Sequence, residues 1–158
     1  MALSQHAAGV KHGWRSGLEE RVARDLAERG IEYRYEALTG EYDVPARVSR
    51  FTPDFLLWNG IVVETKGRWV TADRKKIRLV RAQHPNLDFR MVFSNSKSRI
   101  SKQSKTTYAD VCKRLGIPFA DKLIPEAWLK ERSLKRRWKA IEEFARPGCK
   151  LLLREETT

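Results

Sequence analysis

Apolar residues recur at helical spacing in several parts of the chain. In the first part, Leu18, Val22 and Leu26 lie four positions apart, which predicts a helix from Ser16 to about Arg29 with one buried stripe. Similar patterns, bounded by glycine, proline or a capping residue, predict four more helices. These helices begin at residue 71 or 73, at 107, at 125 and near 134.

Strand-like runs separate the helical segments. Ile31, Tyr33 and Tyr35 alternate with charged residues, as expected for a half-buried strand. Short apolar runs predict further strands over residues 55–58, 61–63, 89–93 and 117–120. Strands that alternate with helices in this way predict an α/β fold, with a central mixed β-sheet flanked by helices.

Two of the apolar runs are joined by Asn59-Gly60, a strong signal for a β-hairpin. A two-residue turn at this pair would place Asp54 opposite Thr65, with its side chain on the face away from Glu64. A three-residue turn made of Trp58, Asn59 and Gly60 would instead place Asp54 opposite Glu64. The choice of turn therefore decides whether the two acids meet.

The three-residue turn is the predicted arrangement, because it explains why three charged residues lie within a core-forming sequence. It pairs Leu57 with Ile61 and needs Gly60 in the left-handed conformation. The two carboxylates then face each other, and Lys66 follows on the same side. Carboxylates at cross-strand distance repel each other unless a cation lies between them, so the hairpin predicts a metal site.

The charged residues of the hairpin also resemble a nuclease motif. Pro53-Asp54, nine further residues and then Glu64-Thr65-Lys66 resemble the PD-(D/E)XK nuclease signature. Over residues 13–130 the chain resembles more closely the phage endonuclease I family, the Holliday-junction resolvases of podophages. The matching motifs are Arg15-Ser-Gly-Leu-Glu19, residues 51–57, Asn59-Gly-Ile61, Val63-Glu-Thr-Lys-Gly67, Asp73-Arg-Lys-Lys76 and Ala120-Asp-Lys-Leu-Ile-Pro125.

The resemblance implies a restriction-endonuclease-like core and metal-dependent cleavage of four-way DNA junctions and other branches, leaving 5′ phosphate and 3′ hydroxyl ends. It implies catalytic roles for Glu19, Asp54, Glu64 and Lys66. We expect one or two Mg²⁺ ions, which Mn²⁺ would replace, bound by the three carboxylates and the Thr65 carbonyl. The resemblance further implies a domain-swapped homodimer, in which Glu19 faces the hairpin of the partner chain.

Glu19 also has a purely structural interpretation. Ser16-Gly-Leu-Glu19 forms a capping box, in which the Glu19 side chain bonds back to the Ser16 amide. Ala23 and Leu26 follow Glu19 at helical spacing, so Glu19 borders the buried face of its helix. The residues alone leave both roles open, and the resemblance favours the catalytic one.

Segment composition divides the chain into three parts. Residues 1–15 are expected to form a flexible N-terminal arm, residues 16–130 the nuclease domain and residues 131–158 a basic C-terminal helix and tail. The C-terminal helix suits docking, DNA contact or both. Within the nuclease domain, Pro45 suits an edge or loop position. The resemblance implies that residues 41–50 form an extended bridge between the two halves of the swapped dimer.

The net charge of +12 is distributed unevenly. Residues 1–64 carry eight Lys/Arg against ten Asp/Glu, whereas residues 65–158 carry 24 against ten. Such a basic bias fits binding to nucleic acid. The cations expected to contact phosphates are Arg74, Lys75 and Lys76 in the helix after residue 71, and Lys97, Arg99, Lys102 and Lys105 in a serine-rich loop. Both groups are also compatible with an ordinary solvated surface.

Length and composition bear on the number of domains and on the cellular compartment. The 158 residues suffice for one domain with a core, and no apolar stretch approaches the ~20 residues that span a bilayer. Two cysteines form no disulfide framework and three scattered histidines form no zinc pattern, so a reducing, cytoplasmic environment is expected, in a bacterial host if the gene is phage-encoded.

Two alternatives to a junction-resolving nuclease stay open. One is another PD-(D/E)XK nuclease that acts at transposon ends or mismatches, and the other is a noncatalytic basic DNA-binding protein.

Overall fold

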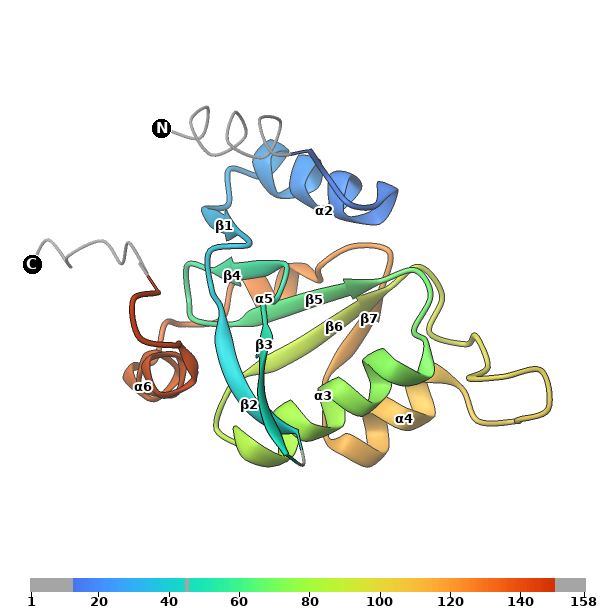
Figure 1. Ribbon diagram of the computed structural model, residues 1–158. Helices are drawn as coiled ribbons and strands as arrows, with labels where there is room; N and C mark the ends of the chain where they lie inside the picture. The colour runs from blue at the N-terminus through green and yellow to red at the C-terminus, as the bar shows by residue number, and fades with distance from the viewer. Residues whose placement is uncertain (1–12, 45, 150–158) are drawn as a thin grey trace, which may run out of the picture.

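The structure, a computed structural model, describes residues 13–44 and 46–149. Its centre is a five-stranded sheet in the order β1–β4–β5–β6–β7 (Figure 1). The pairs β1–β4 and β4–β5 are antiparallel, whereas β5–β6 and β6–β7 are parallel, which confirms the predicted mixed sheet. The strands are β1 (Tyr33–Tyr35), β4 (Phe55–Leu57), β5 (Val62–Lys66), β6 (Phe89–Phe93) and β7 (Phe119–Asp121).

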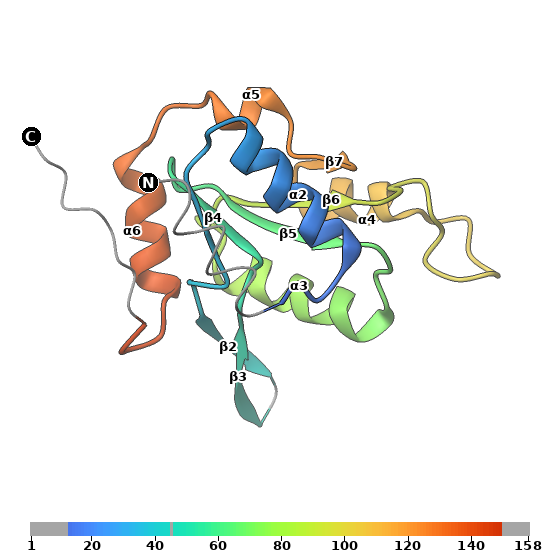
Figure 2. The same cartoon turned by 90° about the horizontal axis from the view of Figure 1, so that it is seen from above.

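Helices cover both faces of this sheet, as predicted. Figures 1 and 2 show α2 over one face, and α3 and α4 over the other. The helices are α2 (Gly17–Glu28), α3 (Thr71–Gln83), α4 (Tyr108–Leu115), α5 (Glu126–Leu129) and α6 (Lys135–Phe144). Their ends follow local sequence signals. Thr107 and Asp110 form a complete capping box before α4, and Gly116 ends that helix at a φ of 66°.

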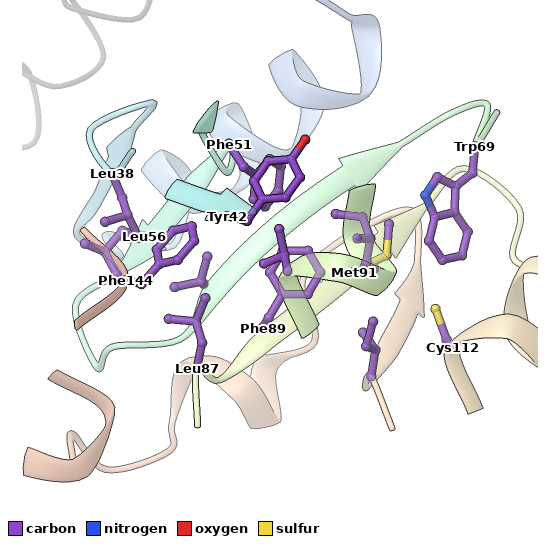
Figure 3. Close-up of a cluster of buried hydrophobic side chains, with 14 of the residues drawn as sticks. Leu38, Tyr42, Phe51, Leu56, Trp69, Leu87, Phe89, Met91, Cys112 and Phe144 are labelled. Atoms are coloured by element: carbon purple, nitrogen blue, oxygen red, sulfur yellow. The ribbon is translucent and has the colours of Figure 1, made fainter. Parts of the chain in front are cut away.

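The hairpin strands β4 and β5 lie between two hydrophobic clusters, because their side chains alternate between the faces of the sheet. Leu56 and Val62 face the cluster that includes residues of α3, α4 and α6 (Figure 3). Phe55 and Val63 face the other cluster, which includes residues of α2 and α5. Cys112 is fully buried in the first cluster, and burial raises the pKa of its thiol to about 12, so Cys112 is a packing residue.

Residues 40–51 form a separate two-stranded hairpin of β2 (Gly40–Val44) and β3 (Arg47–Phe51). The strands pair antiparallel from Gly40 opposite Phe51 to Val44 opposite Arg47. Gln83 of α3 holds the hairpin by exchanging two hydrogen bonds with the Asp43 backbone, at 2.6 and 2.7 Å. Within one chain this segment therefore folds back on itself, and the extended bridge expected between two chains of a swapped dimer stays a prediction.

The C-terminal helix α6 is part of the core. Ala140, Ile141 and Phe144 are buried on its inner side. Phe144 packs so closely against Gly40 that a Cβ atom at residue 40 would lie 2.3 Å from its ring. The sequence had left docking and DNA contact open, and the structure shows that α6 docks. None of the described helices is long and apolar enough to cross a membrane, and most of the predicted N-terminal arm lies outside the described residues.

Candidate active site

The turn between β4 and β5 has the predicted three-residue form. The Leu57 amide donates to the Ile61 carbonyl at 2.9 Å, and the Gly60 amide donates to the Leu57 carbonyl at 3.0 Å. Gly60 adopts a φ of 83°, which glycine tolerates without the strain that a Cβ atom would cause. Asp54 consequently lies opposite Glu64, and its amide donates to Glu64 Oε2 at 3.3 Å. The predicted register is confirmed.

Thr65 holds the Asp54 carboxylate in place. Its amide and its hydroxyl each donate to Asp54 Oδ2 at 2.8 Å. Asp54 and Glu64 are 7% and 4% exposed, so neither carboxylate is well solvated. The sequence predicted a role for the Thr65 carbonyl but not this contact through the Thr65 amide and hydroxyl. The carbonyl role stays a prediction.

Lys66 lies beside these carboxylates, at the end of β5. Its Nζ is 3.3 Å from Glu64 Oε1 and 3.6 Å from Asp73 Oδ2, in the first turn of α3. Burial alone would lower the pKa of Lys66, but the negative charges of Glu64 and Asp73 hold it above its ordinary value. Lys66 therefore remains a cation next to the paired acids.

Burial disfavours the ionised form of Asp54 and Glu64. It raises the pKa of Asp54 to about 6, against the hydrogen bonds from Thr65. Burial and the nearby charge of Asp54 raise the pKa of Glu64 to about 8, against the attraction of Lys66. Two carboxylates with raised pKa values in a cleft or edge site are typical of functional positions, because a bound cation would compensate their charge.

Glu19 approaches the same site from the start of α2. The Ser16 hydroxyl caps the helix by accepting from the Glu19 amide at 3.2 Å, which matches the structural interpretation. The Glu19 carboxylate does not bond back to the Ser16 amide, however. It accepts instead from the Ser16 hydroxyl at 3.2 Å, from the Arg15 amide at 3.3 Å and from the Tyr35 hydroxyl. Glu19 thus combines a capping position with a buried carboxylate near Asp54.

Glu36 is a site residue that was not predicted from the sequence. Its amide donates to the Asp54 carbonyl at 3.0 Å, and its backbone has a φ of 48°, uncommon for a residue with a side chain. Its carboxylate pairs with the Arg15 guanidinium. Strand alternation had placed Glu36 simply on the polar side of the strand that contains Tyr35. Only the pairing of β1 with β4 reveals that Glu36 lies beside Asp54.

Three of these acids form a donor set that could hold a metal ion, and the predicted ligand Glu64 is not among them. Glu19, Glu36 and Asp54 each offer an oxygen, and these three oxygens lie within 4.8 Å of one another. Carboxylate oxygens are the ligands that hard cations such as Mg²⁺ prefer. The cluster forms within one chain, and the expectation that Glu19 faces the hairpin of a partner chain in a dimer stays a prediction.

Comparison with known proteins agrees with this geometry. The family model of phage endonuclease I matches residues 1–145. The chain belongs to the phage endonuclease I family. It is 52% identical over 127 residues to "Endonuclease I" of Escherichia phage T7, covering 79% of this chain and 85% of the relative. It is also 52% identical over 118 residues to "Endodeoxyribonuclease 1" of Enterobacteria phage T3, covering 75% and 78% of the two chains.

In this family member, the cations predicted on α3 differ in their surroundings. Lys75 is exposed, whereas Arg74 and Lys76 are half-buried. Arg74 donates to the Trp69 carbonyl and to the Thr71 hydroxyl, and Lys76 Nζ lies 5.8 Å from the centre of the Phe51 ring. Arg74 and Lys76 therefore already have protein partners, and Lys75 is the most available of the three.

The four predicted loop cations, Lys97, Arg99, Lys102 and Lys105, are all exposed on the loop between β6 and α4, which projects from the body (Figure 1). The loop starts next to the active site, since the Ser94 amide donates to the Lys66 carbonyl at 3.1 Å. Its base is tied down by Ser96, whose amide and hydroxyl donate to the Asp121 carboxylate at 2.6 and 2.8 Å. Exposed cations thus extend outward from the end of β5 that bears Lys66.

Proposed function

We propose that this protein is a metal-dependent endodeoxyribonuclease that resolves four-way DNA junctions and also cuts other branched DNA. The observation that carries the proposal is the buried Asp54–Glu64 pair with Lys66 on one hairpin, in a chain 52% identical to a protein named Endonuclease I. A noncatalytic DNA-binding protein would have no reason to bury two acids whose pKa values are raised by their surroundings.

The metal we propose is Mg²⁺, with Mn²⁺ as a substitute, at one or two positions per site. Asp54 and Glu19 of the acid cluster would hold it together with Glu64 and the Thr65 carbonyl, and Glu36, the third acid of that cluster, suits a supporting role. When bound, Mg²⁺ would make a water molecule more acidic and would stabilise charge on the departing 3′ oxygen. The donor set fits this ion, because it consists of oxygen ligands on rigid elements.

The residues of the chain then have distinct tasks. Lys66 stabilises the negative charge that develops on the attacked phosphate, and Glu64 and Asp73 keep Lys66 protonated and oriented. Thr65 orients the Asp54 carboxylate through two hydrogen bonds. Hydrolysis in this arrangement leaves 5′ phosphate and 3′ hydroxyl ends. Lys75 and the four loop cations bind the phosphates of the junction arms.

We also propose that the active form is a domain-swapped homodimer. A four-way junction needs two cuts in opposed strands, which a two-fold symmetric dimer supplies. The turn between β2 and β3 is a suitable hinge, because Ala46 adopts a φ of 82°, a strained conformation for a residue with a Cβ atom. Opening the hairpin there would relieve this strain and would let α2 and β1 of one chain reach the β4–β5 hairpin of its partner.

One assay tests the proposed function. The purified protein is incubated with a four-way junction, a linear duplex and a mismatched duplex, each with Mg²⁺ and with a chelator. We expect paired cuts in the junction only when Mg²⁺ is present. Preference for the mismatched or linear duplex would indicate another PD-(D/E)XK nuclease, and binding without cleavage of any substrate would indicate a noncatalytic DNA-binding protein.

A further inference from the structure

The turn of the catalytic hairpin does not have the form that its Asn59-Gly60 pair most strongly favours. Asn-Gly most strongly favours a two-residue turn, in which both residues have positive φ. In this structure Gly60 has a positive φ, but Asn59 does not, since the only described non-glycine residues with positive φ are Glu36, Ala46 and Lys122. Some interaction outside the hairpin must therefore favour the three-residue turn.

That interaction comes from the end of α5 and the residues directly after it. The Asn59 side chain is completely buried, and its Nδ2 donates to the carbonyls of Trp128 and Glu131 at 2.9 and 3.0 Å. The neighbouring Trp58 donates its indole Nε1 to the Leu129 carbonyl at 3.2 Å. Two consecutive turn residues are thus bound to one short stretch of backbone, about 70 positions away along the chain.

A network of ion pairs holds residues 128–131 in place. Glu131 accepts from both Arg90 and Arg137, and Arg90 Nη1 lies 2.7 Å from Glu131 Oε1. Asp88 accepts from the same two arginines, each at 2.8 Å. Arg137 of α6 also packs against the turn, because a Cβ atom on Gly60 would lie 2.9 Å from the Arg137 Cβ. The start of β6, the end of α5 and α6 therefore form one rigid support for the turn.

We infer that Asn59 is a positioning residue that sets the register of the catalytic hairpin by binding the 128–131 backbone. A slip to the two-residue turn would move Asp54 opposite Thr65 and turn its side chain away from Glu64. The buried contacts of Asn59 prevent this slip, because they would be broken by it and their polar groups left unpaired. The inference rests on the proposed metal site, since the register matters for function only if these acids act together.

The test compares Asn59→Ala with Asn86→Ala, in which the replaced side chain is exposed and makes no hydrogen bond within the described structure. Three quantities are measured on the full-length protein: Mn²⁺ affinity by calorimetry, junction affinity in chelator, and cleavage rate with Mg²⁺. For Asn59→Ala we expect losses of about 10- to 100-fold in metal affinity and rate, the usual effect of removing an orienting contact, with junction affinity unchanged. Asn86→Ala should change none of the three.

Equal metal affinity and rate in the two folded variants would overturn the inference. If Asn59→Ala does not fold, Trp58→Phe carries the same test, because it removes only the indole donor to Leu129 from a partly exposed side chain. Weaker Mn²⁺ binding by Trp58→Phe would support the register role, and unchanged Mn²⁺ binding would contradict it. If the wild-type protein neither binds Mn²⁺ nor cuts DNA, the proposed function itself fails. The amide pairing of Leu57 with Ile61 in Asn59→Ala, observed by NMR, then decides the register separately.

Discussion

At Asp54 and Glu64, the requirements of stability and of function conflict. Both are buried, Asp54 directly before β4 and Glu64 within β5, beside side chains that form the hydrophobic clusters, and both have raised pKa values. Lys66 compensates one negative charge, and the surrounding hydrogen bonds hold the carboxylates in fixed positions. Residues of this kind lower the stability of the metal-free fold, and their presence is explained by the chemistry they perform.

Replacing these residues should separate binding from cleavage. Glu64→Gln retains the shape of the side chain but removes its charge, so we expect most turnover to be lost while junction affinity remains. Lys66→Ala should slow cleavage by at least ~10²-fold, as for other groups that stabilise charge in the transition state. Gel-shift and cleavage assays on the same preparations measure both effects. Glu142→Gln, at an exposed acid of α6, is the matched control, and parallel losses of binding and cleavage in Glu64→Gln would indicate a folding defect.

The raised pKa of Glu64 also predicts how stability depends on pH. An acid whose pKa is higher in the folded protein than in the unfolded chain binds its proton more tightly when folded. Its favourable contribution is therefore present at low pH and lost as the pH rises from about 4.5 to about 8. In chelator, the melting temperature of the wild type should fall more steeply over this range than that of Glu64→Gln, and the variant should be the more stable at pH 8. Parallel pH profiles would contradict the assigned pKa.

At the scale of elements, the loop between β6 and α4 joins a fixed base to an exposed cationic end. Hydrogen bonds from Ser96 to Asp121 and an isolated bridge between Arg99 and Thr107 order its two sides. The loop leaves β6 beside the end of β5, because these two strands are parallel and in register from Val62 opposite Phe89 to Lys66 opposite Phe93. Parallel pairing thus places the loop and the catalytic residues at one edge of the sheet.

Removing the loop charges should change the salt dependence of DNA binding. Replacing Lys97, Arg99, Lys102 and Lys105 by glutamine should reduce the slope of log affinity against log salt by up to ~0.9 for each lost duplex phosphate contact. The slope is measured with a junction in chelator. The matched control replaces four exposed cations near the start of α6, which are Arg132, Lys135, Arg136 and Lys139. Equal changes of slope in both variants would indicate an effect of net charge alone, rather than contacts made by the loop.

At the scale of the whole molecule, the same contacts allow two arrangements of the chain. In the single chain, α2 and β1 pack beside their own β4–β5 hairpin, and the β2–β3 turn is closed. In a swapped dimer the β2–β3 turn would open, and the same contacts would form with the partner. The proposed dimer would differ from the single chain mainly in the turn around Ala46, so the active site itself would not distinguish the two arrangements.

Mixing two inactive variants distinguishes these arrangements. Glu19→Gln and Glu64→Gln proteins are unfolded together and refolded so that their chains exchange. In a swapped heterodimer, one active site carries both substitutions and the other carries neither, so we expect activity to return in about half of the dimers if chains assort randomly. These dimers should nick a junction rather than make paired cuts. If each chain supplies its own Glu19, every site keeps one substitution, and no activity returns even when heterodimers are present.

The sequence by itself determined the α/β architecture, the helices and the register of the catalytic hairpin. These features follow from the period of the apolar residues and from local signals such as the capping box at Thr107 and the glycine at position 60. The register could be predicted because only one alternative brings Asp54 opposite Glu64. Charges inside a core-forming sequence indicated where the site lies, since such charges are rarely buried without a partner.

Only the tertiary structure decided which distant residues support that hairpin. Glu36 joins the site because β1 pairs with β4, and Asn59 is held by carbonyls about 70 positions later in the chain. Residues 40–51 form a closed hairpin because Gln83 and Phe144 pack against them, although their own sequence is equally compatible with an extended segment. Local periodicity carries no information on such contacts. They depend on how elements far apart in the sequence meet in space, where packing and buried hydrogen bonds override local preference.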